Sequence, residues 1–409
     1  MKFLFIHQNF PGQFLHIAAA LVAKNHKVSA LTLNQRKLSK VWQGIEIIEY
    51  SLDRVNGKDT FPLATDFESK MIRAASCYSK AMELKSEGYS PDIIISHPGW
   101  GESLFLKQVW PEALLKIYCE FFYSISGQDI GFDSECDPRQ KYQLPKVYLK
   151  NTNMLLHADQ AHSFISPTSW QASTFPDYIR DKITVIHDGI DTNVVSPNSN
   201  AAIDFGNGKK ISRKDEVITF ISRSLEPYRG FHIFMRSLPE ILRRRKNAIV
   251  FIVGNEGVSY GAEPPDGHSW KSLILKEIRP LLNNQEYGRI RFLGNIPYES
   301  FKTLLCISTV HVYLTYPFVL SWSLLEAMSS SCTIVASKTP PVEEVITNGE
   351  TGILVDFFEY EEITEEVLSL FENPEKRAML GVNARSFIRE RYDLKTKCLP
   401  AQIAWAERI

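Results

Sequence analysis

The chain has 409 residues, of which 44% are hydrophobic and 23% are charged, so it is too long for one compact core and about right for two domains. A net charge of -1 argues against a nucleic-acid-binding protein, because such proteins carry a strongly basic surface. The six cysteines are scattered, with no CxxC pair and no histidine spacing suited to zinc. Reduced thiols and a cytoplasmic location are therefore expected.

The chain opens with MKFLFIHQNFPGQF, whose apolar run is too short for a signal peptide. No later stretch approaches the roughly 18 apolar residues that a transmembrane helix needs. From the sequence we expect neither an export signal nor a membrane span.

A predicted strand (2–7), a turn at Pro11–Gly12, a helix (13–24) and a second strand (27–33) form a βαβ unit that begins a Rossmann-like sheet. A nicotinamide-dependent enzyme is disfavoured. The turn contains only Gly12 where the dinucleotide fingerprint needs three glycines, and no acid follows the second strand at Leu33–Asn34. Further strands are predicted over 44–50, 92–96, 114–119, 161–166 and 182–187, with helices over 67–86 and 143–156.

Residues 196–215 are rich in Pro, Asn, Gly and charge, which is typical of a linker. After it, alternation of strands and helices resumes. Strands are predicted over 217–222, 248–254, 289–293 and 352–355, and helices over 231–245, 270–282, 298–306, 359–371, 374–391 and 396–408. The sequence therefore predicts two Rossmann-like halves.

Residues 309–337 predict a buried strand, a loop that opens at Pro317, a helix carrying Glu326 and a second buried strand. Ligands of open α/β sheets bind at the carboxyl ends of strands, where a following helix offers free N–H groups. Ser321 to Glu326 occupies such a position. The alternative is a purely structural capping box, because Ser323 precedes Glu326 by three residues.

The first strand–helix junction of the second half reads ISRSLEPYRGF, with Arg223 at the strand end and Arg229 just before the helix. Two guanidinium groups at one strand end suit a diphosphate, because each offers a planar fork of donors that stays charged. Two surface arginines on a loop are the alternative. Their coincidence with other strand-end residues of the same sheet favours the diphosphate site.

These motifs resemble those of the retaining glycosyltransferases of family 4, which have the GT-B fold of two facing Rossmann-like domains. The resemblance rests on SRSLEPYRGF, VIHDGIDTNVVSP, SLLEAM and ETGILV in the second half. In the first half, FIHQNFPGQFLHIAAAL and PDIIISHPGWGESLFLK look like a bacterial subgroup associated with polysaccharide and glycoconjugate synthesis. The resemblance implies an acceptor-binding domain (1–200), a donor-binding domain (201–385) and a terminal helix (386–409) packing back toward the first domain.

The resemblance also implies roles for particular residues. Arg223 and Arg229 match the basic pair on the donor diphosphate, and Glu326 matches the glutamate that hydrogen-bonds the donor ribose. Gly12 matches a glycine turn that approaches the donor phosphates, and His97 matches a histidine facing the transferred sugar. The donor base is expected to meet backbone at two strand ends, near Asn255 and near Ile296.

The sequence departs from the family at one position. A second glutamate is expected eight residues before Glu326, but Phe318 stands there, and a two-residue insertion brings only Tyr316. Ser321 and the backbone around Leu320 are the candidates to replace its contact with the sugar. The departure concerns the identity of the sugar more than the reaction.

Several acidic residues are candidates for ligands or catalysts. Glu120 follows a predicted strand and is a candidate acceptor-side or catalytic residue. The segment GQDIGFDSECD carries Asp129, Asp133, Glu135 and Asp137, but it lacks a full calcium-loop pattern. We expect a solvated acidic loop there, no metal ligand, and metal-independent departure of the nucleotide.

The sequence therefore predicts a cytoplasmic glycosyltransferase that needs no cofactor and uses a UDP-, GDP- or dTDP-sugar as donor. Its acceptor is unknown and could be a sugar, a lipid-linked glycan or a small molecule. No nucleic-acid partner is expected. The basic run 243–246 suits a helix end better than a membrane surface, so peripheral association with the inner face of a membrane is the weaker reading. A nucleotide-sugar epimerase and a non-catalytic nucleotide-sugar-binding subunit are the alternatives.

Overall fold

The computed structural model describes residues 1–33, 35–136, 143–204, 210–265 and 267–409. Asn34, Asp137 and residues 205–209, which entered the sequence predictions above, lie outside these ranges. The chain divides into two compact units. Among described residues, the first contains 1–33, 35–125, 143–189 and 394–409, and the second contains 126–136, 190–204, 210–265 and 267–393.

The first unit is built on a sheet with the strand order β3-β4-β2-β1-β5-β6-β7-β8. All neighbours pair in parallel except β3 with β4. The central strands are buried on both faces, as their continuous apolar sequences require. The strands are β1 (Lys2–Ile6), β2 (Lys27–Thr32), β3 (Val41–Trp42), β4 (Ile45–Glu49), β5 (Ile93–Ser96), β6 (Leu114–Tyr118), β7 (Ser163–Ser166) and β8 (Ile183–Val185).

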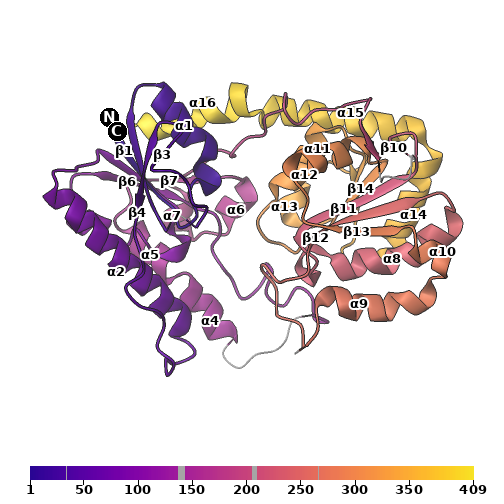
Figure 1. Cartoon of the computed structure of the whole chain (residues 1–409), viewed down its shortest axis with the longest axis horizontal. Coiled ribbons are helices and arrows are strands. Elements are labelled where there is room, and N and C mark those ends of the chain that lie inside the picture. Colours follow the sequence, from indigo (N-terminus) through magenta and orange to yellow (C-terminus); the bar gives the residue numbers. More distant parts are fainter. Residues whose placement is uncertain (34, 137–142, 205–209, 266) are drawn as a thin grey trace. The chain divides into compact units, whose positions relative to one another are not determined.

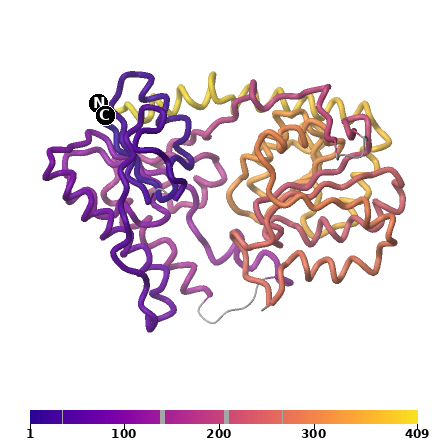
Figure 2. Tube along the Cα trace, in the orientation of Figure 1, coloured from indigo at the N-terminus to yellow at the C-terminus, as the bar shows by residue number. Residues whose placement is uncertain are grey.

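Helices cover both faces of this sheet, and the last helix of the chain is one of them (Figure 1). Helix α16 packs on α1, and Glu407 pairs with Lys24 and His26, so the two ends of the chain lie side by side (Figure 2). The helices are α1 (Leu15–Ala23), α2 (Thr65–Ser86), α3 (Leu106–Val109), α4 (Gln143–Lys150), α5 (Thr152–Ala158), α6 (Ser169–Ser173), α7 (Asp177–Arg180) and α16 (Leu399–Glu407), with short helices η1 (Gly12–Phe14), η2 (Pro98–Trp100) and η5 (Leu394–Cys398).

The second unit contains a parallel sheet of order β13-β12-β11-β14-β15-β16 and a separate antiparallel pair, β9 with β10. Strand β11 lies in the middle of the sheet between β12 and β14. The strands are β9 (Ala202–Asp204), β10 (Lys210–Ser212), β11 (Val217–Ser224), β12 (Ile249–Asn255), β13 (Ile290–Gly294), β14 (Val310–Tyr313), β15 (Ile334–Ser337) and β16 (Ile353–Val355).

Two helical layers sandwich the second sheet (Figure 1). One layer contains α11, α12 and α15, whose apolar side chains share a core with β11, β12, β14 and β15. On the other face α8 packs Phe234 flat against Phe220 of β11, with ring centroids 4.7 Å apart. The helices are α8 (Phe231–Arg244), α9 (Trp270–Ile278), α10 (Asn284–Tyr287), α11 (Tyr298–Ile307), α12 (Trp322–Ser329), α13 (Pro340–Glu343), α14 (Tyr360–Glu372) and α15 (Pro374–Arg391), with short helices η3 (Pro227–Arg229) and η4 (Arg279–Leu281).

The boundaries of the units differ from the predicted division at residues 200 and 385. Residues 190–200 belong to the second unit, because Ile190 bridges to Asp393 and Val195 lies in its core. Residues 386–393 also belong to it, since residues 386–391 complete helix α15 and Asp393 pairs with Ile190. The segment 126–136, expected in the first domain, is likewise part of the second unit.

Candidate functional site

A pocket of about 550 Å³ opens at the carboxyl ends of the strands in the second unit, and we call it the strand-end pocket. Five residues predicted as donor ligands line it: Arg223, Arg229, Ile296, Ser321 and Glu326. Its other lining residues were not predicted to bind the donor. These are Phe220, Ile221, Ser222, Val253, Tyr260, Asn295, Tyr298, Phe301, Tyr313, Leu314 and Ser323.

Arg229 is the buried cation of the pocket, with only 7% of its surface exposed. Its Nη1 donates a 2.6 Å hydrogen bond to Thr315 Oγ1 and a longer one to the carbonyl of Val319. Its guanidinium carbon lies 5.3 Å from the centre of the Tyr260 ring. These partners are all neutral, so the positive charge is oriented but not neutralised by them.

Arg223 is the exposed cation, at the end of β11. Among the described residues, its side chain has no hydrogen-bond or ion-pair partner. Gly230 lies nearby at the start of α8, with a φ of +70°. A β-carbon on Gly230 would lie 2.3 Å from Cβ of Leu314, so only glycine lets the helix begin this close to the neighbouring strand.

Glu326 lies on α12 and accepts a 2.6 Å hydrogen bond from the Tyr298 hydroxyl at the start of α11. Burial raises the pKa of Glu326 to about 6, although the Tyr298 hydrogen bond opposes the shift. The capping-box alternative is wrong, because Ser321 is the N-cap of α12 and accepts from the backbone N–H of Ser323. The Glu326 carboxylate is therefore not used to cap α12, and it lines the strand-end pocket.

Phe318, which replaces the expected first glutamate, is 5% exposed and packs edge-on against Tyr228. It also contacts the Tyr260 ring, with centroids 5.3 Å apart. No carboxylate takes its place among the residues that line the strand-end pocket, apart from Glu326. Ser321, a candidate to compensate, does line the pocket, and its backbone N–H donates to the Tyr313 hydroxyl.

Glu226 holds the pocket's loop and was missed by sequence reasoning. Its side chain is fully buried and accepts backbone N–H groups from Ser259, Tyr260 and Gly261. These bonds fix Tyr260, which in turn stacks against the Arg229 guanidinium. The residue directly follows SRSL in the motif, but nothing local in the sequence points to a loop more than thirty positions away.

Three predicted donor residues do not line the pocket, and one of them, Gly12, belongs to the first unit. Leu320 is 7% exposed and packs into the core beneath α12. Asn255 ends β12 with an exposed side chain, and its carbonyl accepts the backbone N–H of Leu225. The expectation that backbone near Asn255 and near Ile296 meets the donor base stays a prediction.

In the first unit, His97 and Glu120 lie at neighbouring strand ends, with His97 Nε2 3.3 Å from Glu120 Oε2. They line a smaller cavity of about 220 Å³ together with Lys70 and Lys150. Desolvation raises the pKa of Glu120, but His97 and the hydrogen bond from Gln13 outweigh it and hold that pKa below its usual value. The geometry thus supports an ionised Glu120 beside the histidine.

Gly12 packs against His7 in the same unit. It has a φ of +49°, and a β-carbon there would lie 2.3 Å from His7 Nε2. Burial, together with neighbouring His97, lowers the pKa of His7 to about 3, so His7 is neutral. Its Nε2 is 2.9 Å from Oε1 of Gln13, and the amide Nε2 of Gln13 donates to Glu120. Packing on a neutral histidine therefore requires glycine at this turn, independently of any phosphate.

Within the described ranges, no helix combines the length and apolar character needed to cross a lipid bilayer.

Comparison with known proteins matches both halves of the chain. Residues 24–195 match the family described as Glycosyl transferase family 4 group, and residues 205–387 match Glycosyl transferases group 1. HepE of Anabaena, solved in complex with UDP-glucose, has a similar structure, with a TM-score of 0.70 at 17% identity. That match covers 99% of this chain and 98% of HepE.

Two curated proteins are similar in sequence. An uncharacterised glycosyltransferase of Methanocaldococcus jannaschii is 27% identical over 54% of this chain. The matched region covers 51% of the length of the archaeal protein. Spore coat protein SA of Bacillus subtilis is 21% identical over 91% of this chain and 88% of its own length.

These matches and the two parallel-sheet units define the class: the chain has the GT-B fold, which confirms the predicted fold class. It contains a region that matches the family 4 group of glycosyl transferases, followed by a region that matches group 1.

Proposed function

We propose that the chain is a retaining family 4 glycosyltransferase that moves a sugar from a nucleoside-diphosphate sugar to an acceptor hydroxyl. One observation carries the proposal: Arg223, Arg229 and Glu326 line a single strand-end pocket. Two guanidinium groups suit a diphosphate, and a carboxylate suits the hydroxyls of a ribose. HepE, which was solved with UDP-glucose, supports a UDP-sugar donor. Polysaccharide, glycolipid or glycoconjugate synthesis is the proposed setting.

The chemistry follows from the charge that develops when the donor breaks. Cleavage of the anomeric C–O bond leaves negative charge on the β-phosphate, and fixed cations or N–H groups aimed there lower the barrier. Arg223 and Arg229 supply the cations, and α8 and α12 begin at the same edge of the sheet with their positive dipole ends. Removing one such donor should cost on the order of 3 kcal/mol in the transition state.

The first unit contributes three further residues to the proposal. His97 would face the transferred sugar, Glu120 would act on the acceptor side, and Gly12 would approach the donor phosphates. The His97–Glu120 pair supports the first two roles, because a carboxylate 3.3 Å from the imidazole orients its ring at the strand ends. Cytoplasmic action, with or without contact with the membrane's inner face, stays a prediction.

The test is turnover of labelled UDP-, GDP- and dTDP-sugars with a panel of saccharide and lipid-linked acceptors. The proposal predicts acceptor-dependent release of one nucleoside diphosphate and a product whose anomeric configuration matches that of the donor. Inversion of the anomeric centre would contradict the retaining mechanism. Conversion of the donor sugar without any acceptor would identify an epimerase instead.

A non-catalytic nucleotide-sugar-binding subunit is the second candidate, and Phe318 is the observation that favours it. This position lacks the carboxylate that family 4 enzymes use, and the phenyl ring is packed away against Tyr228. A chain that binds a nucleotide sugar tightly yet releases no nucleotide with any acceptor would support this candidate. Restored turnover in Phe318→Glu would then locate the loss at this residue.

A further inference from the structure

The acidic segment 126–136 is packed into the second unit, which corrects the expectation of a solvated loop. Asp129 is 7% exposed and Asp133 is 2% exposed. The hydroxyl of Tyr228 donates to Asp129 at 2.7 Å, and that of Tyr316 donates to Asp133 at 2.5 Å. The segment is therefore held on the second unit by buried polar contacts.

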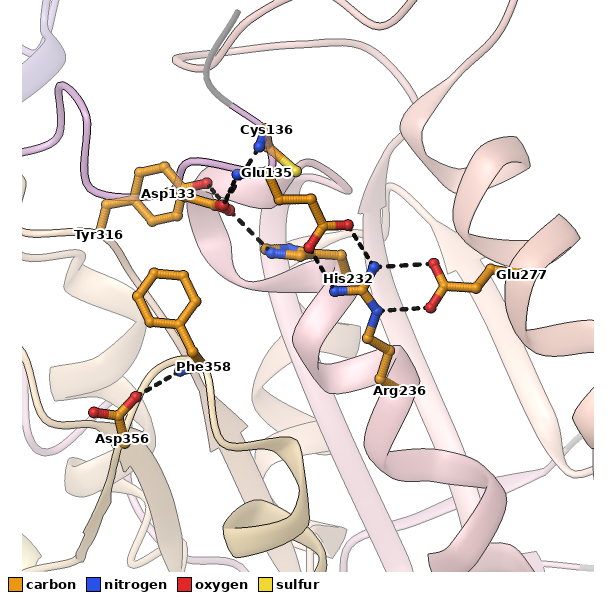
Figure 3. Close-up of polar contacts among 9 residues, drawn as sticks. All are labelled: Asp133, Glu135, Cys136, His232, Arg236, Glu277, Tyr316, Asp356 and Phe358. Atoms are coloured by element: carbon orange, nitrogen blue, oxygen red, sulfur yellow. Dashed lines mark hydrogen bonds and ion pairs between the residues drawn. The ribbon is translucent and has the colours of Figure 1, made fainter.

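Three potential metal ligands meet where this segment packs against α8. One ligand atom each from Asp133, Cys136 and His232 lies within 4.8 Å of the other two. Figure 3 shows Asp133 and Cys136 on the segment and His232 on α8, with its ring directed at the Asp133 carboxylate. Carboxylate, thiolate and imidazole are the ligands that Zn²⁺ uses in proteins.

His232 provides an independent sign of a ligand. Its side chain is fully buried, and neither ring nitrogen makes a hydrogen bond of good geometry within the described residues. Buried polar groups normally have such a partner. Its Nε2 lies 3.1 Å from Asp133 Oδ2. Two ligands at about 2.0–2.1 Å from a tetrahedral zinc ion are roughly 3.3 Å apart, so this separation suits two ligands of one ion.

The surroundings hold the ligands in place. Oδ1 of Asp133 accepts the backbone N–H groups of Glu135 and Cys136, a turn that brings the cysteine back toward the aspartate. Arg236, one helical turn after His232, binds the Glu135 carboxylate through both terminal nitrogens. The turn at Asp133 orients the two ligands of the segment, as contacts around a metal site do, whereas the Glu135–Arg236 pair docks the segment on α8. Cys136 is partly exposed, which gives an ion a route of entry.

We propose that Asp133, Cys136 and His232 bind a divalent transition-metal ion of the Zn²⁺ class, with water at a fourth position. The carboxylate and the thiolate together match its two positive charges. None of the three ligands lines the strand-end pocket. The ion would fasten segment 126–136 to α8, a structural role separate from the proposed sugar transfer. Sequence spacing could not show this site, because His232 lies far along the chain from Cys136.

Titration of the metal-stripped full-length protein with Co²⁺ tests the site, since a thiolate ligand gives a sulfur-to-cobalt charge-transfer band. The proposal predicts one Co²⁺ per chain with this band, displacement by Zn²⁺, and a higher melting temperature in Zn²⁺. Cys136→Ser should abolish the band and weaken Zn²⁺ binding at least tenfold. Asp133→Asn should weaken binding while keeping the band.

Glu135→Gln is the matched control, because Glu135 belongs to the same segment but its carboxylate binds Arg236. This variant should keep the charge-transfer band and one Co²⁺ per chain. Equal loss of the band and of Co²⁺ binding in Glu135→Gln and Cys136→Ser would contradict the proposal. It would show that metal binding depends on the docking of the segment and not on the thiolate. Absence of a stoichiometric band in the wild type, or its persistence in Cys136→Ser, would overturn it.

Discussion

The hydroxyl of Tyr298 donates a 2.6 Å hydrogen bond to Oε1 of Glu326, joining the first turn of α11 to α12 in the strand-end pocket. Tyr298 gives the carboxylate a donor in a place where burial disfavours its charged form. The pair therefore places an anionic hydrogen-bond acceptor in the pocket at neutral pH, where the proposed function requires a partner for the donor ribose.

Tyr298→Phe tests this pair. The variant keeps the ring but removes the donor, and a hydrogen bond to a charged group is worth about 1.5–3 kcal/mol. We expect the variant to bind its nucleotide roughly tenfold more weakly or worse, measured by isothermal titration calorimetry. Tyr287→Phe is the control, since Tyr287 lies beneath the Arg279 guanidinium and away from the pocket. Equal affinities for wild type and Tyr298→Phe would show that the pair does not serve binding.

The raised pKa of Glu326 also predicts that the stability of the folded protein depends on pH. Its folded-state pKa of about 6 lies above the ordinary value of 4.5, so the folded protein binds this proton more tightly than the unfolded chain does. Its contribution is fully present below about pH 4.5 and is lost as the pH rises through 6. The loss is at most about 2 kcal/mol.

Urea unfolding of wild type and Glu326→Gln at pH 4.5 and pH 7 measures this term. Other carboxyl groups titrate in both proteins, so the difference between the two isolates Glu326. The free energy of unfolding of the wild type should fall relative to that of the variant as the pH rises. Parallel pH dependence in the two proteins would show that Glu326 is not desolvated.

Gly230→Ala should destabilise the second unit in two ways. The alanine would clash with Leu314, and it would be strained by the positive φ of this position. The new β-carbon would meet Leu314 Cβ at 2.3 Å, whereas Gly349, with a comparable φ of +76°, has open space around it. Both alanine variants carry the positive-φ cost of about 1–2 kcal/mol. Gly230→Ala should lose at least about 1 kcal/mol more than Gly349→Ala in urea unfolding, as overpacking does. Equal losses would mean that Leu314 moves aside freely.

Much of the fold was predictable because its signals are local. Apolar runs such as 217–221 mark buried parallel strands, and Pro374 and Arg391 bound helix α15 as predicted. Arg223 and Arg229 were predicted from their place between a strand and a helix, and Glu326 from its place in the next such junction together with the family resemblance.

Residues that act across long separations were missed. Glu226 accepts a backbone N–H of the loop at Tyr260, and the Tyr298 hydroxyl donates to Glu326 on a different helix. Neither contact leaves a local pattern in the sequence. The acidic segment was predicted to be solvated because its charges dominate its composition. Its partners His232 and Tyr316 come from distant parts of the chain, and only folding reveals that Asp133 is buried.

The account rests most directly on nucleotide binding at the arginine pair. Thermal-shift titration of the wild type, Arg223→Ala and Arg243→Ala with UDP, GDP, dTDP and ADP tests it, because Arg243 is a surface arginine paired with Glu240. A ligand at a hundred times its dissociation constant adds about 2.7 kcal/mol of stability. We predict that one nucleotide stabilises the wild type and Arg243→Ala but not Arg223→Ala. Equal stabilisation of all three proteins, or of none, would contradict the account.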